Sequence, residues 1–173
     1  SDCSDAGERI SIQYGTSLCY PFSSMGSHVS AVPNHQTGRI TSLKTRGDMA
    51  TMGQFGFELD MSQMTEEELE TSKQLVARYK KYGEVFHRGD LYRLRSPFEE
   101  NEAAFEFISE DQNTVILVIA NRLAKARGPL YPIKLAGLEP TARYALAMDE
   151  ENLLVNEKMP AGRSWRGDEL MYR

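Results

Sequence analysis

The residue best placed to do chemistry is Asp2, an acidic side chain directly before a helical pattern. In barrel enzymes, catalytic groups lie at the carboxyl end of a strand, just before the helix of an α/β unit. A carboxyl there can transfer a proton as a general acid or base. The position also suits a helix N-cap, because Asp is a preferred cap. From the residues alone the cap is the favoured interpretation, and Asp5 is interpreted as structural, at the helix start.

Further polar candidates fall on a short strand and on the loop that follows it. His28 lies among small and apolar residues, so a core histidine is favoured over a ligand or base. The loop that would face the top of a barrel carries four hydrogen-bonding side chains: Asn34, His35, Gln36 and Arg39. For these we favour loop hydrogen bonding over a role in a site.

Two acidic residues and one aromatic residue complete the candidates. Glu58 and Asp60 end a predicted strand and are a possible carboxylate pair, although residues two apart on a strand share a face in any case. Trp165 is a possible sugar platform, but a buried sheet aromatic is the favoured interpretation.

The elements that must position these residues alternate in the first half of the chain. A helix from Ser4, capped by Asp2 or Ser4, ends before Pro21. Its apolar stripe is Ala6, Ile10, Tyr14 and Leu18. A strand over 25–32, a helix over 46–52 capped by Thr45 and a strand over 56–60 follow.

The clearest helix begins at Thr65, which with Glu68 forms a capping box. Gly83 interrupts or ends this helix, and the expected apolar face is Leu69, Val76, Tyr79 and Phe86. Helices alternating with strands predict an α/β unit with parallel strands.

Beyond residue 88 the pattern changes to short strands separated by turns. Strands are expected over 91–94, 103–109, 114–120, 131–135, 143–148 and 152–155. The segment 105–107 alternates, whereas 115–119 reads as a fully buried run. The series predicts an antiparallel β-sandwich.

Composition narrows the function classes. The net charge of −5 gives no reason to expect nucleic acid, which needs a basic surface. No apolar run approaches the roughly 20 residues of a membrane helix, and no signal peptide is visible. Cys3 and Cys19 are expected to be reduced, which suits a cytoplasmic protein. The three histidines lack metal-ligand spacing, so we expect no metal site.

Several segments together resemble the microbial α-galactosidases of glycoside hydrolase family 36. The first forty residues are the most specific, and the resemblance covers the whole chain. The matching segments are Ser1-Asp2, Asp5-Ala6, Glu8-Arg9, Ile12-Gln13-Tyr14-Gly15-Thr16-Ser17, Tyr20-Pro21, Met25-Gly26-Ser27-His28-Val29-Ser30, Pro33-Asn34, Gly38-Arg39, Gly56-Phe57-Glu58-Leu59-Asp60, Arg93-Leu94 and Ser96-Pro97-Phe98.

The resemblance implies an α/β then all-β fold, the C-terminal part of a (β/α)8 TIM barrel followed by an antiparallel β-sandwich domain. Residues 1–88 would run from the end of barrel strand six to the last barrel helix, and residues 89–173 would form a truncated sandwich domain. Asp2 would be the catalytic and substrate-binding general acid/base. The activity implied is retaining hydrolysis of terminal α-galactosides such as melibiose and raffinose, without a cofactor.

The nucleophile and most sugar-binding residues lie upstream of this chain in the family, and both ends of the chain look cut. We therefore expect a fragment that is inactive and poorly stable alone, from a full-length protein that forms a homotetramer. Cys3 departs from the family's usual polar residue, and Gly7 from its usual branched apolar one. The alternatives are a non-catalytic carbohydrate-binding or assembly module and a galactosyl-transferring oligosaccharide synthase.

Overall fold

The computed structural model describes residues 3–123, 132–145 and 164–172. The chain forms two compact units, residues 1–128 and residues 129–173. Within the described residues, no helix is both long enough and apolar enough to cross a membrane.

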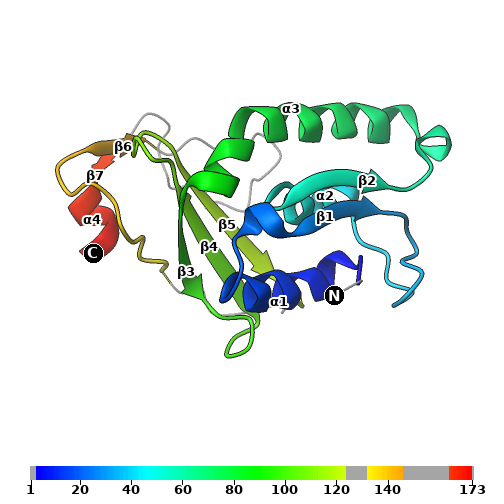
Figure 1. The fold of residues 1–173 in the computed structure, drawn as a ribbon, viewed down its shortest axis with the longest axis horizontal. Coiled ribbons are helices and arrows are strands. Elements are labelled where there is room, and N and C mark those ends of the chain that lie inside the picture. Colours follow the sequence, from blue (N-terminus) through cyan, green and yellow to red (C-terminus); the bar gives the residue numbers. More distant parts are fainter. Residues whose placement is uncertain (1–2, 124–131, 146–163, 173) are drawn as a thin grey trace. The chain divides into compact units, whose positions relative to one another are not determined.

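The first unit begins with alternating helices and strands (Figure 1). Its elements are α1 (Ala6–Ser17), η1 (Phe22–Ser24), β1 (Gly26–Ser30), α2 (Leu43–Thr51), β2 (Gln54–Glu58) and η2 (Met61–Gln63). The strands β1 and β2 pair in parallel, with Gly26 opposite Gln54 and Ser30 opposite Glu58. The predicted alternation and the parallel direction of the strands are therefore confirmed.

The starts of α1 and α2 differ from the prediction. Asp5, rather than Asp2 or Ser4, is the N-cap of α1, because its carboxylate accepts the N–H of Glu8. Likewise Ser42, rather than Thr45, caps α2. Leu18 lies just past the end of α1 and is 62% exposed, so it does not extend the apolar stripe.

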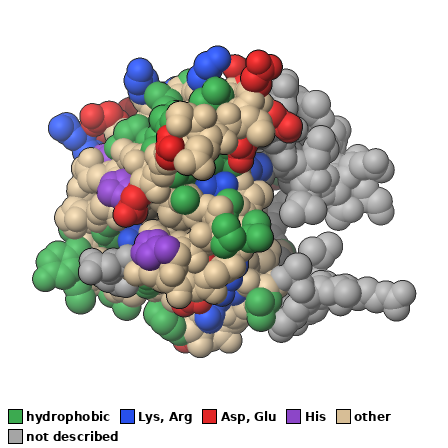
Figure 2. Space-filling view, turned by 90° about the vertical axis from the view of Figure 1, so that its right-hand side faces the viewer, with side chains coloured by type: hydrophobic (Ala, Val, Ile, Leu, Met, Phe, Trp, Pro, Cys, Tyr) green, Lys and Arg blue, Asp and Glu red, His purple; other side chains and the backbone are tan. Residues whose placement is uncertain are grey.

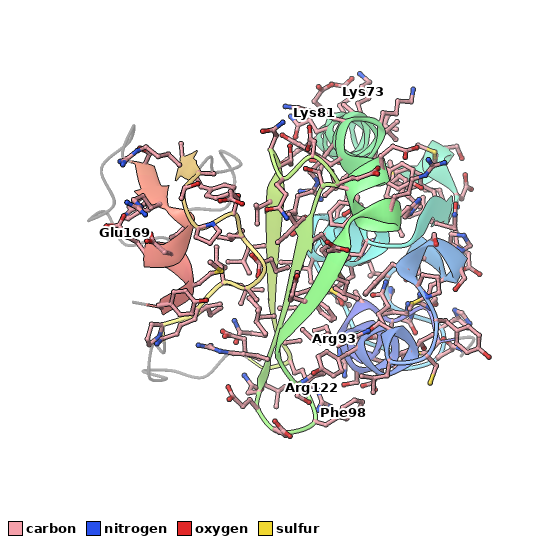
Figure 3. The ribbon with its side chains drawn as sticks, turned by 60° about the vertical axis from the view of Figure 1, so that its left-hand side comes forward. Lys73, Lys81, Arg93, Phe98, Arg122 and Glu169 are labelled. Atoms are coloured by element: carbon pink, nitrogen blue, oxygen red, sulfur yellow. The ribbon has the colours of Figure 1, made fainter. Side chains whose placement is uncertain are left out.

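The long helix α3 (Glu66–Arg88) has the predicted capping box between Thr65 and Glu68. Gly83 is buried inside it and does not interrupt it. The predicted face is partly wrong: Phe86 is buried, but Leu75 is buried in place of Val76. Lys73 and Lys81 point away from the sheets (Figure 3).

Three antiparallel strands follow: β3 (Asp90–Arg95), β4 (Glu102–Ile108) and β5 (Val115–Asn121). Their burial reverses the prediction. Every residue of β4 from Ala103 to Ile108 is buried, including Glu106, whereas Leu117 and Ile119 of β5 are exposed. The reason is position in the sheet: β4 is the central strand, and Glu106 lies between residues of both neighbouring strands, but β5 is an edge strand.

The second unit contains β6 (Arg143–Ala145), β7 (Ser164–Arg166) and α4 (Gly167–Tyr172). The strands pair antiparallel, with Tyr144 opposite the half-buried Trp165. Residues 132–135 form no strand, contrary to the prediction, and the predicted strand over 152–155 lies outside the described residues. The antiparallel sheets agree with the predicted strand direction, and their assembly into a sandwich stays a prediction.

One hydrophobic core joins the helices to the three-stranded sheet. Tyr14 of α1 packs on Phe105 of β4, with ring centroids 5.6 Å apart, and Phe86 of α3 packs on Phe107 of β4 at 5.0 Å. The buried members of this core are Ala6, Ile10, Tyr14, Phe22, Met25, Met49, Met52, Phe86, Ala103, Phe105 and Phe107. The sheet therefore supports α1, whose first turn lies beside the candidate site.

Candidate active site

Ser4, two residues after Asp2, is bonded to the last residue of β1 and to the loop that follows it. The backbone N–H of Ser4 donates to Gln36 Oε1 at 2.9 Å, and its Oγ accepts from Asn34 Nδ2 at 3.0 Å. The Ser4 carbonyl accepts from Ser30 Oγ at 3.1 Å. Asp2 itself lies outside the described residues, so its catalytic and substrate-binding role stays a prediction.

Asp5 is a buried anion that joins the first turn of α1 to the loop after β1. Its side chain is fully buried, and it accepts the N–H of Glu8 at 3.0 Å and the hydroxyl of Thr37 at 2.5 Å. It also forms an ion pair with Arg39. Burial alone would raise the pKa of Asp5, but the Thr37 and Glu8 hydrogen bonds and the Arg39 charge together lower it. Its structural role is confirmed.

The loop that supplies these partners, residues 34–39, is held together by hydrogen bonds between its own residues. Asn34 Oδ1 accepts the backbone N–H groups of Gln36 and Thr37 at 3.0 and 3.2 Å. The Asn34 N–H donates to the Arg39 carbonyl at 2.9 Å. Loop hydrogen bonding is therefore confirmed for Asn34, Gln36 and Arg39, while His35 is exposed.

His28 lies on the face of the β1–β2 sheet opposite the buried Ser27 and Val29. Its side chain is 49% exposed, so the prediction of a core histidine is wrong. Its Nδ1 lies 3.9 Å from Oε2 of Glu58. Figure 2 shows histidine and acidic side chains close together on one face of the molecule.

Glu58 and Asp60 have separate partners and are not brought together as a pair. Glu58 faces His28, whereas Asp60 caps η2 and accepts from Ser62 and Gln63. The hydrogen bonds from Ser62 and Gln63 lower the pKa of Asp60. Asp60 is therefore a capping residue.

Sequence reasoning missed two side chains that fix this end of the sheet. Arg46 Nη1 donates to the Ser30 carbonyl at 2.5 Å, and its Nε donates to the Thr41 carbonyl at 3.0 Å. Thr37 binds Asp5 across 32 residues of chain. The Arg46–Ser30 and Thr37–Asp5 contacts leave no signal in local spacing, because they join residues 16 and 32 positions apart.

The cysteine and histidine side chains are also possible metal ligands. Cys3 and Cys19 form no disulfide bond in the described part of the chain. Among the described residues, no group of His, Cys, Asp and Glu side chains is arranged to hold a metal ion.

Comparison with known proteins identifies two sequence families along the chain. Residues 1–89 match the family described as Melibiase, and residues 102–173 match the glycosyl hydrolase family 36 C-terminal domain. The α-galactosidase AgaA of Geobacillus stearothermophilus is 48% identical over 99% of this chain, which covers 22% of that protein. The α-galactosidase Mel36A of Lactobacillus acidophilus is 42% identical, with the same coverage.

The crystal structure of AgaA superposes with a TM-score of 0.87 over 99% of this chain and 22% of that structure. A variant of AgaA solved in complex with raffinose gives a TM-score of 0.87 at 46% identity, with the same coverage of both chains. The chain thus spans about a fifth of the length of the curated relatives it matches.

Proposed function

Because this chain belongs to glycoside hydrolase family 36, the family of the melibiases, we propose that it is part of a retaining α-galactosidase in which Asp2 is the general acid/base. The observation that supports this role is the bonding of Ser4 and Asp5 beside the carboxyl end of β1. That is where a barrel enzyme presents its catalytic groups. The match of residues 1–89 to the family supports the same assignment.

In this mechanism Asp2 acts twice. It first donates its proton to the glycosidic oxygen while a second carboxylate attacks the anomeric carbon, which releases the aglycone and forms a covalent glycosyl-enzyme. Asp2 then removes a proton from water, which displaces the enzyme carboxylate and releases galactose with retained configuration. The two carboxyl groups must lie roughly 5 Å apart. The nucleophile would come from the part of the enzyme that this chain does not cover.

The proposed substrates are terminal α-galactosides of the melibiose and raffinose type, cleaved without a cofactor. Raffinose is bound by the AgaA variant described above, which supports this class. We further propose that the 173 residues alone are inactive. Two strands cannot close a barrel, and the exposed His28 and Glu58 lie on a sheet face that would be enclosed if further strands extended the sheet into a closed barrel.

The test uses a chimera in which these 173 residues replace the matched segment of AgaA. We expect the chimera to hydrolyse melibiose and a nitrophenyl α-galactoside. Asp2→Asn should lose melibiose turnover far more than turnover of the nitrophenyl substrate, whose leaving group needs no protonation. Azide should restore turnover of the nitrophenyl substrate by replacing the water that Asp2 activates.

Equal activity of the chimera and its Asp2→Asn variant on melibiose would overturn the assignment of Asp2. Binding of galactosides without turnover would favour a binding module. Transfer of galactose to added sugar in place of water would favour an oligosaccharide synthase.

A further inference from the structure

We propose that His28 and Glu58 form a binding subsite for one hydroxyl group of the terminal galactose. The inference rests on the proposed function, because it names two further residues of the same site. It is carried by one juxtaposition on the exposed face of the β1–β2 sheet. There an imidazole nitrogen and a carboxylate oxygen face each other at a separation that a single hydroxyl group can bridge.

The helices pack on one face of the β1–β2 sheet, and the pair lies on the other. Ser27 and Val29 are buried, and Val29 packs with Phe57 in a core that includes residues of α2 and α3. Successive side chains of a strand point to opposite faces. His28, between two buried residues, and Glu58, next to Phe57, therefore share the face that is turned away from these helices.

The pair also lies near the carboxyl ends of both strands. Glu58 is the last residue of β2, and it is opposite Ser30, the last residue of β1. His28 comes two residues earlier on β1, which places it roughly 6–7 Å below the strand end. Barrel enzymes bind their substrates at the carboxyl ends of the strands. In the proposed barrel the pair would therefore face the bound substrate.

The distance between the two side chains suits a bridging hydroxyl group. His28 Nδ1 and Glu58 Oε2 are 3.9 Å apart, which is longer than a direct hydrogen bond of about 2.7–3.2 Å. Within the part of the chain that the structure describes, neither side chain makes a hydrogen bond, and both are about half exposed. A hydroxyl group between them donates its proton to Glu58 and accepts the Nδ1 proton of His28. Sugar hydroxyl groups have this double capacity.

Gly56 makes room for the imidazole ring. It is directly opposite His28 in the register of the two strands. A Cβ at Gly56 would lie 2.9 Å from His28 Cδ2 and 3.3 Å from Nε2. The ring thus lies against β2 in the space that a side chain would fill, with Nδ1 facing Glu58. Alanine at this position would displace the ring without removing a polar group.

The depth of His28 favours the terminal galactose over the rest of the substrate. An enzyme that removes a terminal sugar holds that sugar deepest in its site, while the remaining sugars extend toward solvent. His28 lies below the strand ends, on the deep side of such a site. A site built to bind a hydroxyl group rejects analogues that lack it, because its polar groups are then left unpaired.

The experiment measures kcat/KM of the AgaA chimera for nitrophenyl α-galactoside and for its analogues deoxygenated at C3, C4 or C6. The ratio of two such values for one preparation is independent of the folded fraction. In Glu58→Met the preference for the full sugar should shrink about tenfold for one analogue and stay unchanged for the other two. His28→Phe should shrink the same ratio by a smaller factor, because the bond to the carboxylate is the stronger one.

Three further variants sharpen the comparison. Gly56→Ala should affect the same ratio as His28→Phe, because it displaces the ring. His28→Asn, whose amide reaches the place of Nδ1, should keep more of the preference than His28→Phe. Glu70→Met is the matched control, because Glu70 is 61% exposed and pairs with a cation, Lys73, at 3.0 Å, but on α3. It should leave every ratio unchanged.

Unchanged ratios for all three analogues in Glu58→Met and His28→Phe would overturn the inference. Equal changes for all three would overturn it as well, because they would indicate altered packing and not one lost bond. A changed preference between raffinose and melibiose, with unchanged deoxy ratios, would mean that the pair binds sugars beyond the galactose. An inactive parent chimera would instead overturn the proposed function itself, so the two failures are distinguished.

Discussion

Arg93 of β3 holds Ser17 at the last turn of α1. Its Nε donates to Ser17 Oγ at 2.8 Å, and its Nη2 donates to the Ser17 carbonyl. The last carbonyls of a helix lack partners within the helix, and a cation there also complements the helix dipole. Figure 3 shows Arg93 beside α1. The helix is therefore fixed at both ends, by the loop at Asp5 and by the sheet at Ser17.

Replacing Arg93 by Met should destabilise the last turn of α1. The substitution keeps much of the side-chain length but removes both hydrogen bonds, at a cost of about 1–3 kcal/mol. Hydrogen exchange of the peptide covering residues 14–20 in the chimera measures this loss of stability as faster exchange. Arg122→Met is the control, since Arg122 is exposed and donates one bond of 3.3 Å to the Pro97 carbonyl. Equal protection in both variants would contradict the role of Arg93.

Replacing two helix glycines by alanine should change the stability of the protein in opposite directions. At Gly15 of α1 a Cβ would meet the ring of Phe98 at 3.5 Å, an ordinary contact, so Gly15→Ala should stabilise by up to about 1 kcal/mol. At Gly47 of α2 a Cβ would collide with the buried Leu75, so Gly47→Ala should cost about 1–3 kcal/mol. Thermal unfolding of the two chimera variants checks this, and shifts of the same sign would refute it.

Acid should weaken the first turn of α1 through Asp5. Folding lowers the pKa of this carboxyl below its usual 3.8, so its stabilising contribution is complete above that value. The contribution is lost as the pH falls through the lower pKa of the folded state. Asp5→Asn should therefore be less stable than the parent near pH 7, and the difference should shrink below about pH 4.

Hydrogen exchange of the peptide covering residues 6–12 of the chimera, corrected for intrinsic rates, follows this change. Asp111→Asn, in the turn between β4 and β5, should leave that peptide unchanged at every pH. A difference between Asp5→Asn and the parent that grows toward acid pH would show that the sign is wrong.

The 173 residues alone should release no nitrophenol from an aryl α-galactoside. They should also bind a hydrophobic dye, because Leu117, Ile119 and Ile40 are exposed. The chimera at equal concentration should turn over the substrate and bind less dye. Turnover by the isolated chain would mean that it contains its own nucleophile.

Local signals in the sequence predicted much of the fold. The Thr65 capping box and the alternation from α1 to α3 were predictable, because caps and helical periodicity act over a few residues. The burial of β4 and β5 was predicted in reverse, because it depends on which strand is central in the sheet. The pattern of apolar residues along the chain does not determine the order of the strands in the sheet.

The candidate site divides in the same way. The loop polarity of Asn34 and Gln36 was evident, but their bonds to Ser4 join residues 30 and 32 positions apart. The pairing of Asp5 with Arg39 depends equally on tertiary structure. The proposed role of Asp2 comes from the family resemblance, because from its residue type and position alone a helix cap is the favoured interpretation.

The packing of Tyr14 and Phe86 on β4 limits how such enzymes can exchange parts. A crossover between the two family matches, after residue 89 and before residue 102, would separate aromatic side chains from the strand they were selected to fit. In recombinants joined there, Tyr14 and Phe86 would come from one parent and the facing Phe105 and Phe107 from the other, so the rings should pack poorly. Crossovers after β5 would transfer the helices together with the three-stranded sheet, so the shared hydrophobic core would come from one parent.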